Sequence, residues 1–138
     1  MQNYSVLMSV YHKEKPEYLR QAIESIQAQT LSTNDFVLVC DGPLNEPLDS
    51  VIAAKQQEMG ESLNVVRLAK NGGLGNALNE GIKHCKNELV ARMDSDDIAY
   101  PDRCEKQIAV FNIHSEVSIC SGIVEEFTTD PHLSLIHI

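Results

Sequence analysis

Residues 88–107 read ELVARMDSDDIAYPDRCEKQ, and their pattern is that of a strand, an acidic loop and the beginning of a helix. The apolar run that ends at Met93 predicts a short strand. Three carboxylates follow within residues 94–97, and Pro101 stands where a helix commonly has its first residue. Strand, loop and helix in this order form the repeating unit of α/β folds. The stretch therefore predicts one such unit, with its chemistry concentrated in the loop.

The same unit occurs three times towards the N-terminus. Apolar runs predict strands at Tyr4–Val10, Phe36–Cys40 and Leu63–Leu68, and a further strand is expected at Val117–Val124. Residues at helical spacing follow each of the first three strands and the acidic loop. These residues are Leu19, Ala22, Ile23 and Ile26, then Leu48, Val51, Ile52, Lys55 and Met59, then Leu74, Ala77, Leu78, Ile82 and Cys85, and finally Cys104, Ile108 and Phe111.

This alternation predicts a Rossmann-like α/β domain, in which a mainly parallel sheet carries helices on both faces. In such sheets, ligands bind beyond the carboxyl ends of the strands, at the point where the strand order reverses. Any binding site should therefore be formed by the loops at residues 9–15, 41–43, 70–75 and 94–97.

The composition bounds the class of protein. The chain has 138 residues, 43% of them hydrophobic and 22% charged, which is typical of one soluble globular domain or part of one. Its formal net charge of -9 would repel a phosphate-rich polymer, so we expect no nucleic acid partner. An anionic ligand would need backbone N–H groups or a bridging divalent cation.

Cys40, Cys85, Cys104 and Cys120 show no spacing typical of a metal site and are expected to be reduced thiols. The sequence contains no export signal and no apolar run long enough to span a membrane. These features predict a cytoplasmic protein. Any peripheral association with the inner face of the membrane would use segments absent from this sequence.

Asp94, Asp96 and Asp97 admit two interpretations. Carboxylates this close repel one another, and a bound Mg²⁺ or Mn²⁺ would relieve the repulsion and help an acidic protein to bind phosphate. Alternatively, they form a solvated turn that caps the following helix. An EF-hand calcium loop is excluded because Ala99 stands where that loop requires glycine. A phosphatase is disfavoured because its nucleophilic aspartate usually follows the first strand, which here leads into Ser9.

The glycine-rich stretch NGGLGN, residues 71–76, lies between a predicted strand and a predicted helix. Its backbone N–H groups could reach a phosphate at the start of the helix. However, it lacks the lysine of a P-loop and the third glycine of the dinucleotide-binding motif. The residues alone favour the alternative, a left-handed turn before a closely packed helix start.

Asp41 and Tyr11 also follow predicted strands, and each has two open interpretations. The Asp41 carboxylate could accept hydrogen bonds from a base or a ribose, or form a local turn with Gly42 and Pro43. The Tyr11 ring could stack on a nucleobase or pack against the protein. None of the five histidines is spaced to pair with a nucleophile or a metal.

Four blocks occur in a fixed order: residues 5–30 (SVLMSVYHKEKPEYLRQAIESIQAQT), 40–43 (CDGP), 71–82 (NGGLGNALNEGI) and 91–107 (ARMDSDDIAYPDRCEKQ). Together they resemble the nucleotide-binding half of family 2 glycosyltransferases, with most likeness to the bacterial exopolysaccharide (amylovoran-type) branch. The resemblance covers residues 3–128 and favours the metal interpretation of the acidic loop.

The resemblance implies a GT-A fold and a nucleotide-diphosphate sugar donor, commonly a UDP-sugar. It also implies a divalent cation, Mg²⁺ or Mn²⁺, and inverting transfer to a saccharide or lipid-linked saccharide acceptor. By position, it implies nucleotide-binding roles for Ser9, Val10, Tyr11, Glu14, Asp41, Asn71, Gly72 and Asp94, and metal ligation by Asp96 and Asp94. It implies no catalytic residue, because the general base of the family comes from the second half of the domain.

Residues 1–130 are therefore expected to form the N-terminal part of a truncated nucleotide-sugar-binding domain. Residues 131–138 (PHLSLIHI) depart from the family pattern and are expected to be a foreign tail. This chain is expected to bind the donor but to lack the catalytic base, in a pathway that builds exopolysaccharide or another surface polysaccharide. The alternative function is a non-catalytic, Mg²⁺-dependent nucleotide-binding module.

Overall fold

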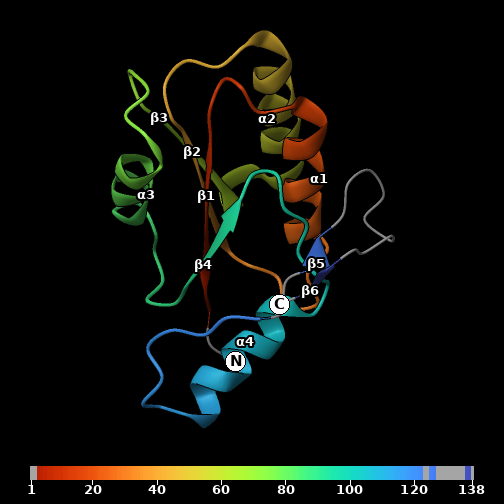
Figure 1. Ribbon diagram of the computed structural model, residues 1–138, viewed down its shortest axis with the longest axis vertical. Helices are drawn as coiled ribbons and strands as arrows, with labels where there is room; N and C mark the ends of the chain where they lie inside the picture. The colour runs from red at the N-terminus through yellow and green to blue at the C-terminus, as the bar shows by residue number, and fades with distance from the viewer. Residues whose placement is uncertain (1–2, 123–124, 127–135, 138) are drawn as a thin grey trace.

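The computed structural model describes residues 3–122 and the backbone at 125–126 and 136–137. The elements, in chain order, are β1 (Ser5–Val10), α1 (Pro16–Gln27), β2 (Asp35–Cys40), α2 (Glu46–Met59), the short 3₁₀ helix η1 (Gly60–Ser62), β3 (Leu63–Arg67), α3 (Leu74–Ile82), β4 (Val90–Asp94), α4 (Arg103–Ile113), β5 (Glu125–Glu126) and β6 (Ile136–His137). Strands and helices alternate through α4, which confirms the predicted α/β class (Figure 1).

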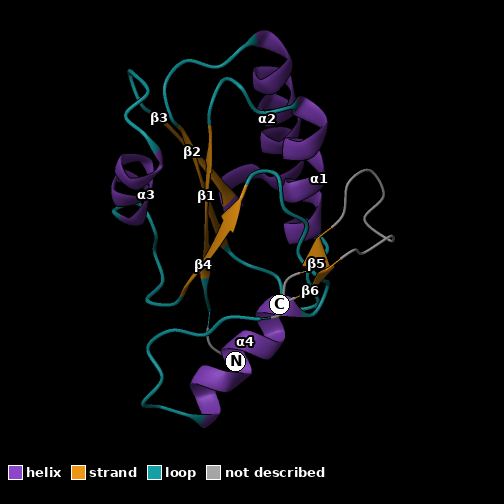
Figure 2. Ribbon diagram, viewed as in Figure 1, coloured by secondary structure: helices purple, strands orange, loops and turns teal. Residues whose placement is uncertain are grey.

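The central sheet has four parallel strands in the order β3-β2-β1-β4. The chain builds outward from β1 to β3 and then returns to place β4 on the other side of β1. The strand order therefore reverses next to β1, and the loops at the carboxyl ends of the strands meet there. Figure 2 shows α1 and α2 on one face of this sheet and α3 on the other.

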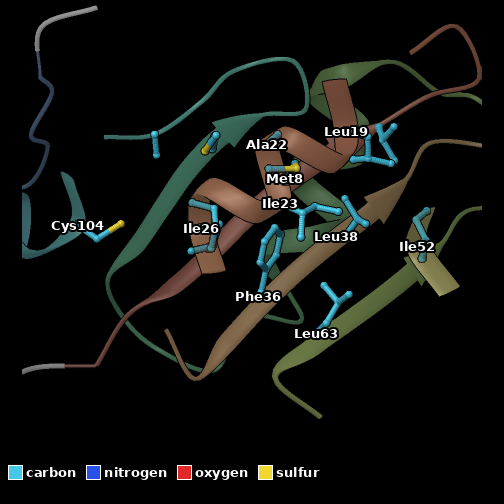
Figure 3. Packing of buried hydrophobic residues seen from close by; sticks show 14 of the residues in the cluster. Met8, Leu19, Ala22, Ile23, Ile26, Phe36, Leu38, Ile52, Leu63 and Cys104 are labelled. Atoms are coloured by element: carbon cyan, nitrogen blue, oxygen red, sulfur yellow. The ribbon is translucent and has the colours of Figure 1, made fainter. Parts of the chain in front are cut away.

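The larger core lies between the sheet and the helices α1 and α2. Because side chains alternate along a strand, Met8 and Leu38 point to this face, while Leu7 and Val39 point to the opposite face. Figure 3 shows Phe36 from β2 packed beneath the helical residues of α1. The predicted inward residues of α1 are all buried, namely Leu19, Ala22, Ile23 and Ile26.

Local signals explain where the helices begin. Pro16 occupies the first turn of α1, where a missing N–H costs nothing. The side chain of Asn45 caps α2 by accepting a hydrogen bond from the backbone N–H of Leu48 at 3.0 Å. α4 begins at Arg103, two residues later than the predicted start at Pro101.

The smaller core, on the opposite face, forms where α3 packs closely on β1 and β2. A Cβ atom at Gly81 would lie 2.5 Å from Leu7 Cδ1 and 2.6 Å from Val39 Cγ2, so only glycine fits here without a shift. This contact turns Ala77 and Gly81 towards the sheet. Consequently Ile82, at 47% exposure, does not face the core, and the prediction that it continues the apolar stripe is wrong.

The end of α1 holds the segment that follows the acidic loop. Gln29 is buried, and its side-chain amide donates to the carbonyl of Tyr100 at 2.6 Å. Its side-chain oxygen accepts a hydrogen bond from the backbone N–H of Cys104 at 3.0 Å. The hydroxyl of Ser25 accepts another from the N–H of Ala99 at 3.0 Å. The acidic loop is thus followed by a segment that is firmly fixed to α1.

The predicted strand at Val117–Val124 is absent from its described part, residues 117–122. The N–H of Val117 donates to the carbonyl of His114 at 3.1 Å in a turn after α4, and Ile119 is 88% exposed. An apolar run forms a strand only where a neighbouring strand pairs with its backbone N–H and C=O groups and other elements cover its side chains. Residues 123–124 and the expected foreign tail lie outside the described residues, apart from the β6 backbone.

None of the helices in the described part of the chain combines the length and the apolar character that crossing a membrane requires.

Candidate functional site

An open pocket of about 400 Å³ lies at the carboxyl ends of the strands, beside the reversal in strand order. All four loops that the sequence predicts for a binding site contribute to it. The lining residues are Ser9, Tyr11 and Glu14, then Asp41, then Asn71, Gly73 and Leu74, and finally Asp94, Ser95 and Asp96. The topology rather than any single motif thus brings these distant segments together.

The β1–α1 loop supplies one wall of the pocket. Ser9 lies near the end of β1, where the parallel ladder pairs it with Asp94 of β4. The Tyr11 ring is exposed and meets the ring of His12 edge-on, with 5.7 Å between the centroids. An exposed aromatic face at a pocket wall is suited to stacking on a flat ligand.

Asp41, at the end of β2, is only 4% exposed and connects two loops. Its two carboxylate oxygens accept hydrogen bonds from the backbone N–H groups of Gly72 at 2.9 Å and Gly73 at 3.1 Å. The side-chain bonds therefore reach the β3–α3 loop, and not Gly42 or Pro43 as the local-turn interpretation expects. A carboxylate has about four lone-pair positions, so Asp41 keeps acceptor capacity towards the pocket.

Two backbone N–H groups of the glycine-rich loop donate to the Asp41 carboxylate. Because Gly72 and Gly73 both donate to Asp41, these two groups do not point towards a phosphate site. Gly73 has a φ of 93°, in the left-handed region, and α3 begins at the next residue. The positive φ agrees with the turn interpretation, but residues 71–76 are exposed, so the closely packed helix start that this interpretation also predicts is wrong.

The acidic loop directly follows β4. Asp94, Asp96 and Asp97 are exposed, and each offers one carboxylate oxygen such that all three oxygens lie within 4.8 Å of one another. Desolvation of its carboxyl group raises the pKa of Asp97, and the negative charges of Asp96 and Asp94 raise it further. Convergent carboxylate oxygens are the donor set that Mg²⁺ and Mn²⁺ prefer, so the residues present fit such an ion.

Other groups hold the acidic loop in shape. The N–H of Asp97 donates to the carbonyl of Asp94 at 3.2 Å, which closes a turn. The Arg92 guanidinium lies 3.5 Å from an Asp94 carboxylate oxygen. Ser95 points inward, is 6% exposed, and donates its hydroxyl proton to Glu14 Oε2 at 2.5 Å.

The pocket contains seven of the nine residues that the sequence assigns to the nucleotide and metal site: Ser9, Tyr11, Glu14, Asp41, Asn71, Asp94 and Asp96. Val10 does not line it, because its side chain is buried in the larger core. Gly72 does not line it either, although its N–H bonds to Asp41.

Sequence reasoning missed three residues of this region. Gly73 and Leu74 line the pocket, and both belong to the NGGLGN stretch, so that motif could have pointed to them. Leu74 was assigned to the apolar stripe of α3, yet it is exposed at the pocket wall. Ser95 lies inside the acidic motif, but nothing in the sequence shows which way its side chain turns.

Comparison with known proteins gives a consistent family. Residues 5–137 match the family described as Glycosyl transferase family 2. Amylovoran biosynthesis glycosyltransferase AmsE of Erwinia amylovora is 48% identical over 124 residues, which are 90% of this chain and 46% of AmsE. The UDP-Gal:alpha-D-GlcNAc-diphosphoundecaprenol beta-1,3-galactosyltransferase of Escherichia coli is 37% identical over 128 residues, 93% of this chain and 46% of that protein.

Among solved structures, residues 1–349 of TarS from S. aureus in complex with UDP are similar, with a TM-score of 0.70 and 26% identity. The similarity covers 82% of this chain and 33% of the TarS chain. The four-stranded parallel sheet and its helices have the same arrangement as in this structure, which confirms the predicted GT-A fold.

The chain spans about half the length of the curated relatives that it matches. The family match nevertheless extends over almost all of its residues, and the AmsE match alone covers nine tenths of them. On these grounds, together with the arrangement of the sheet and its pocket, the chain belongs to glycosyltransferase family 2.

Proposed function

We propose that this chain is the donor-binding part of an inverting glycosyltransferase that transfers a sugar from a nucleotide-diphosphate sugar to a saccharide acceptor. One observation carries the proposal: a single pocket at the carboxyl ends of the strands combines an exposed aromatic ring, a buried carboxylate and an acidic loop. These are the three kinds of group that a nucleoside, its hydrogen-bonding edge and a metal-bound diphosphate require.

On the nucleoside side, we assign Tyr11 to stacking against the base. Asp41 accepts hydrogen bonds from the base or the ribose with the lone pairs that Gly72 and Gly73 leave open. Ser9, Val10, Asn71 and Gly72 form the backbone frame around the nucleoside. For Val10 and Gly72 this role is one of backbone position, since neither lines the pocket.

On the diphosphate side, Asp96 and Asp94 hold a Mg²⁺ or Mn²⁺ ion, and Asp97 contributes negative charge close by. Such an ion would neutralise the charge that the diphosphate gains as its bond to the sugar breaks. The residues of this chain bind and orient the donor, so that the anomeric carbon faces the acceptor side.

A UDP-sugar is the proposed donor, and a lipid-linked saccharide is the proposed acceptor. TarS is described in complex with UDP, and the E. coli relative is named for a UDP-galactose donor and a diphosphoundecaprenol-linked acceptor. AmsE is named for amylovoran biosynthesis, which supports a role in the synthesis of exopolysaccharide or another surface polysaccharide.

We further propose that the general base, which removes the proton from the acceptor hydroxyl, comes from the part of the longer relatives that this chain does not match. Of the acids that line the pocket, all except Glu14 are proposed nucleotide or metal ligands, and Glu14 bonds to Ser95. Residues 1–130 then correspond to the donor-binding half. A transfer assay with this chain should accordingly show no glycosylated product, and measurable transfer would contradict the missing base.

The proposed compartment is the cytoplasm, with the enzyme acting at the inner face of the membrane. All four cysteines are free thiols, which is usual for proteins of a reducing compartment. A lipid-linked acceptor would bring the enzyme to the membrane surface.

Calorimetric titration of UDP tests the donor site. We expect UDP to bind in the presence of Mn²⁺, with GDP and ATP binding more weakly, and we expect UDP to keep only a weaker, metal-independent affinity when a chelator replaces Mn²⁺. Asp96→Asn should abolish the Mn²⁺-dependent part. Asp49→Asn, which removes a carboxylate paired with Arg67 outside the pocket, should not. A folded chain that binds none of the three nucleotides would overturn the donor site, and equal binding by Asp96→Asn would overturn the metal assignment.

A further inference from the structure

A hydrogen bond between side chains joins the two sides of the pocket. Ser95 Oγ donates to Glu14 Oε2 at 2.5 Å, although 81 positions separate the two residues in the sequence. Glu14 belongs to the loop that carries Tyr11, and Ser95 lies between Asp94 and Asp96 in the acidic loop. This bond therefore connects the proposed nucleoside side to the proposed metal side.

Glu14 is fixed at several points. Its second carboxylate oxygen, Oε1, accepts a hydrogen bond from the N–H of Lys15 at 3.0 Å. Its own N–H donates to the carbonyl of Tyr11 at 3.1 Å. Both carboxylate oxygens are thus engaged by the protein, and the backbone of Glu14 is tied to the residue with the exposed ring.

The placement of Glu14 has an electrostatic cost. Its charge acts on Asp97 in the same unfavourable sense as the charges of Asp96 and Asp94. Yet among the described residues Glu14 is outside the group of carboxylates whose oxygens converge within 4.8 Å. An acid beside an acidic loop that is not itself placed as a ligand needs another reason to be there.

The Ser95 hydroxyl supplies that reason. A hydroxyl that donates to a carboxylate makes a short, charge-assisted bond, which is stronger than a bond between neutral groups. The bond fixes Ser95, which is 6% exposed, between the exposed carboxylates of Asp94 and Asp96, and all three residues line the pocket. Mutation of outer groups that orient metal-binding carboxylates typically lowers metal affinity by about 10–100-fold.

We infer that Glu14 is a positioning residue, which acts through Ser95 to hold Asp94 and Asp96 in place, and does not contact the nucleotide. The inference rests on the proposed function and deepens it, because it gives Glu14 a different role from the nucleoside contact that the family resemblance implies. Glu14 thereby couples the loop of Tyr11 to the acidic loop.

A double-mutant cycle on UDP affinity tests this role, with every titration made once with Mn²⁺ and once with a chelator. Ser95→Ala and Glu14→Met should each weaken the Mn²⁺-dependent affinity by about tenfold. Neither should change the affinity measured with the chelator. The double variant should bind no more weakly than either single variant, because both remove the same bond.

Two further variants separate positioning from charge. Glu14→Gln keeps an oxygen that can accept from Ser95 and should restore most of the affinity that Glu14→Met loses. Glu88→Met removes an exposed acid outside the pocket and should leave the affinity unchanged. Thermal unfolding of each variant, followed by circular dichroism, identifies any loss that comes from misfolding.

The outcomes distinguish this inference from the proposed function. If the unmodified chain does not bind UDP with Mn²⁺, the proposed function fails. If it binds, and the effects of Ser95→Ala and Glu14→Met add up, Glu14 contacts the nucleotide directly and the positioning role is wrong. The same conclusion follows if Glu14→Gln is as weak as Glu14→Met, or if the chelator titrations change as much as those with Mn²⁺.

Discussion

Gly42 and Asn71 bring two loops of the pocket into backbone contact: a Cβ atom at Gly42 would lie 2.6 Å from the backbone nitrogen of Asn71. Gly42 also has a φ of 90°, in the left-handed region that side chains disfavour. The β2–α2 loop can therefore approach the β3–α3 loop only because position 42 has no side chain. This approach brings Asp41 within reach of the N–H groups of Gly72 and Gly73.

Gly42→Ala should accordingly destabilise the protein. The unfavourable φ alone costs about 1–3 kcal/mol, and the clash is with backbone atoms that cannot rotate away. Urea unfolding measures the loss. Gly75→Ala is the matched control, because its Cβ would meet nothing within 4 Å and its φ is not positive. Equal stability of the two variants would contradict the close approach.

Asp41→Asn should loosen the glycine-rich loop as well as weaken nucleotide binding. In the unmodified protein each carboxylate oxygen of Asp41 accepts one N–H group, from Gly72 or from Gly73. Asparagine keeps one of these acceptor oxygens, but its NH₂ group then faces the other N–H group, and two donors cannot form a hydrogen bond. Because Gly72 and Gly73 are themselves exposed, the lost hydrogen bond should loosen the loop locally without unfolding the protein. Amide hydrogen exchange of Gly72 and Gly73, followed by NMR, should speed up in the variant. Unchanged exchange at both glycines would show that Asp41 does not hold the loop.

The sequence predicted the parts of the fold that depend on local pattern. Apolar runs locate β1 to β4, and Pro16 locates the start of α1, because burial and backbone geometry impose these patterns wherever the fold occurs. The run at residues 117–124 shows where this reasoning fails. Its first six residues form no strand, since strand formation depends on neighbours that a local pattern does not contain.

The candidate site was predictable at the level of loops and less so at the level of contacts. Topology places the carboxyl ends of parallel strands together, so the sequence could predict that Tyr11, Asp41 and Asp96 share a pocket. The bond between Glu14 and Ser95 depends on side-chain directions in two loops of no regular geometry. The orientation of α3 likewise depends on one close contact, at Gly81.

The four cysteines should differ in their reactivity towards an alkylating reagent. Burial raises the pKa of Cys40 to about 11 and also raises the pKa of Cys104, so both carry little thiolate at mildly alkaline pH. Cys120 is only half-buried. Mass-spectrometric mapping should show Cys120 alkylated before Cys40 and Cys104 in the native protein, and all of them alkylated in denaturant. Labelling of native Cys40 as fast as Cys120 would show that β2 is not a buried strand.

The final prediction concerns Lys55, which is 4% exposed between α1 and α2. Its ammonium lies 3.1 Å from Glu24 and 2.9 Å from Glu58. Burial alone would lower the pKa of Lys55, but the hydrogen bonds to Glu58 and Glu24 outweigh burial and raise it. The bond from Lys55 lowers the pKa of Glu24, and bonds from Gln27 and Lys55 lower that of Glu58.

A lowered carboxyl pKa stabilises the fold above the ordinary value of 4.5, and the contribution is lost as the pH falls through the lowered value. Acidification below 4.5 should therefore reduce the free energy of unfolding. In the Lys55→Met variant, the free energy of unfolding should fall less steeply over the same pH range. Methionine fills a similar volume but carries no charge that lowers the carboxyl pKa values. Urea titrations at several pH values measure both slopes, with Lys83→Met as the control for an exposed lysine. Parallel slopes in Lys55→Met and the unmodified protein would show that the acid sensitivity arises elsewhere.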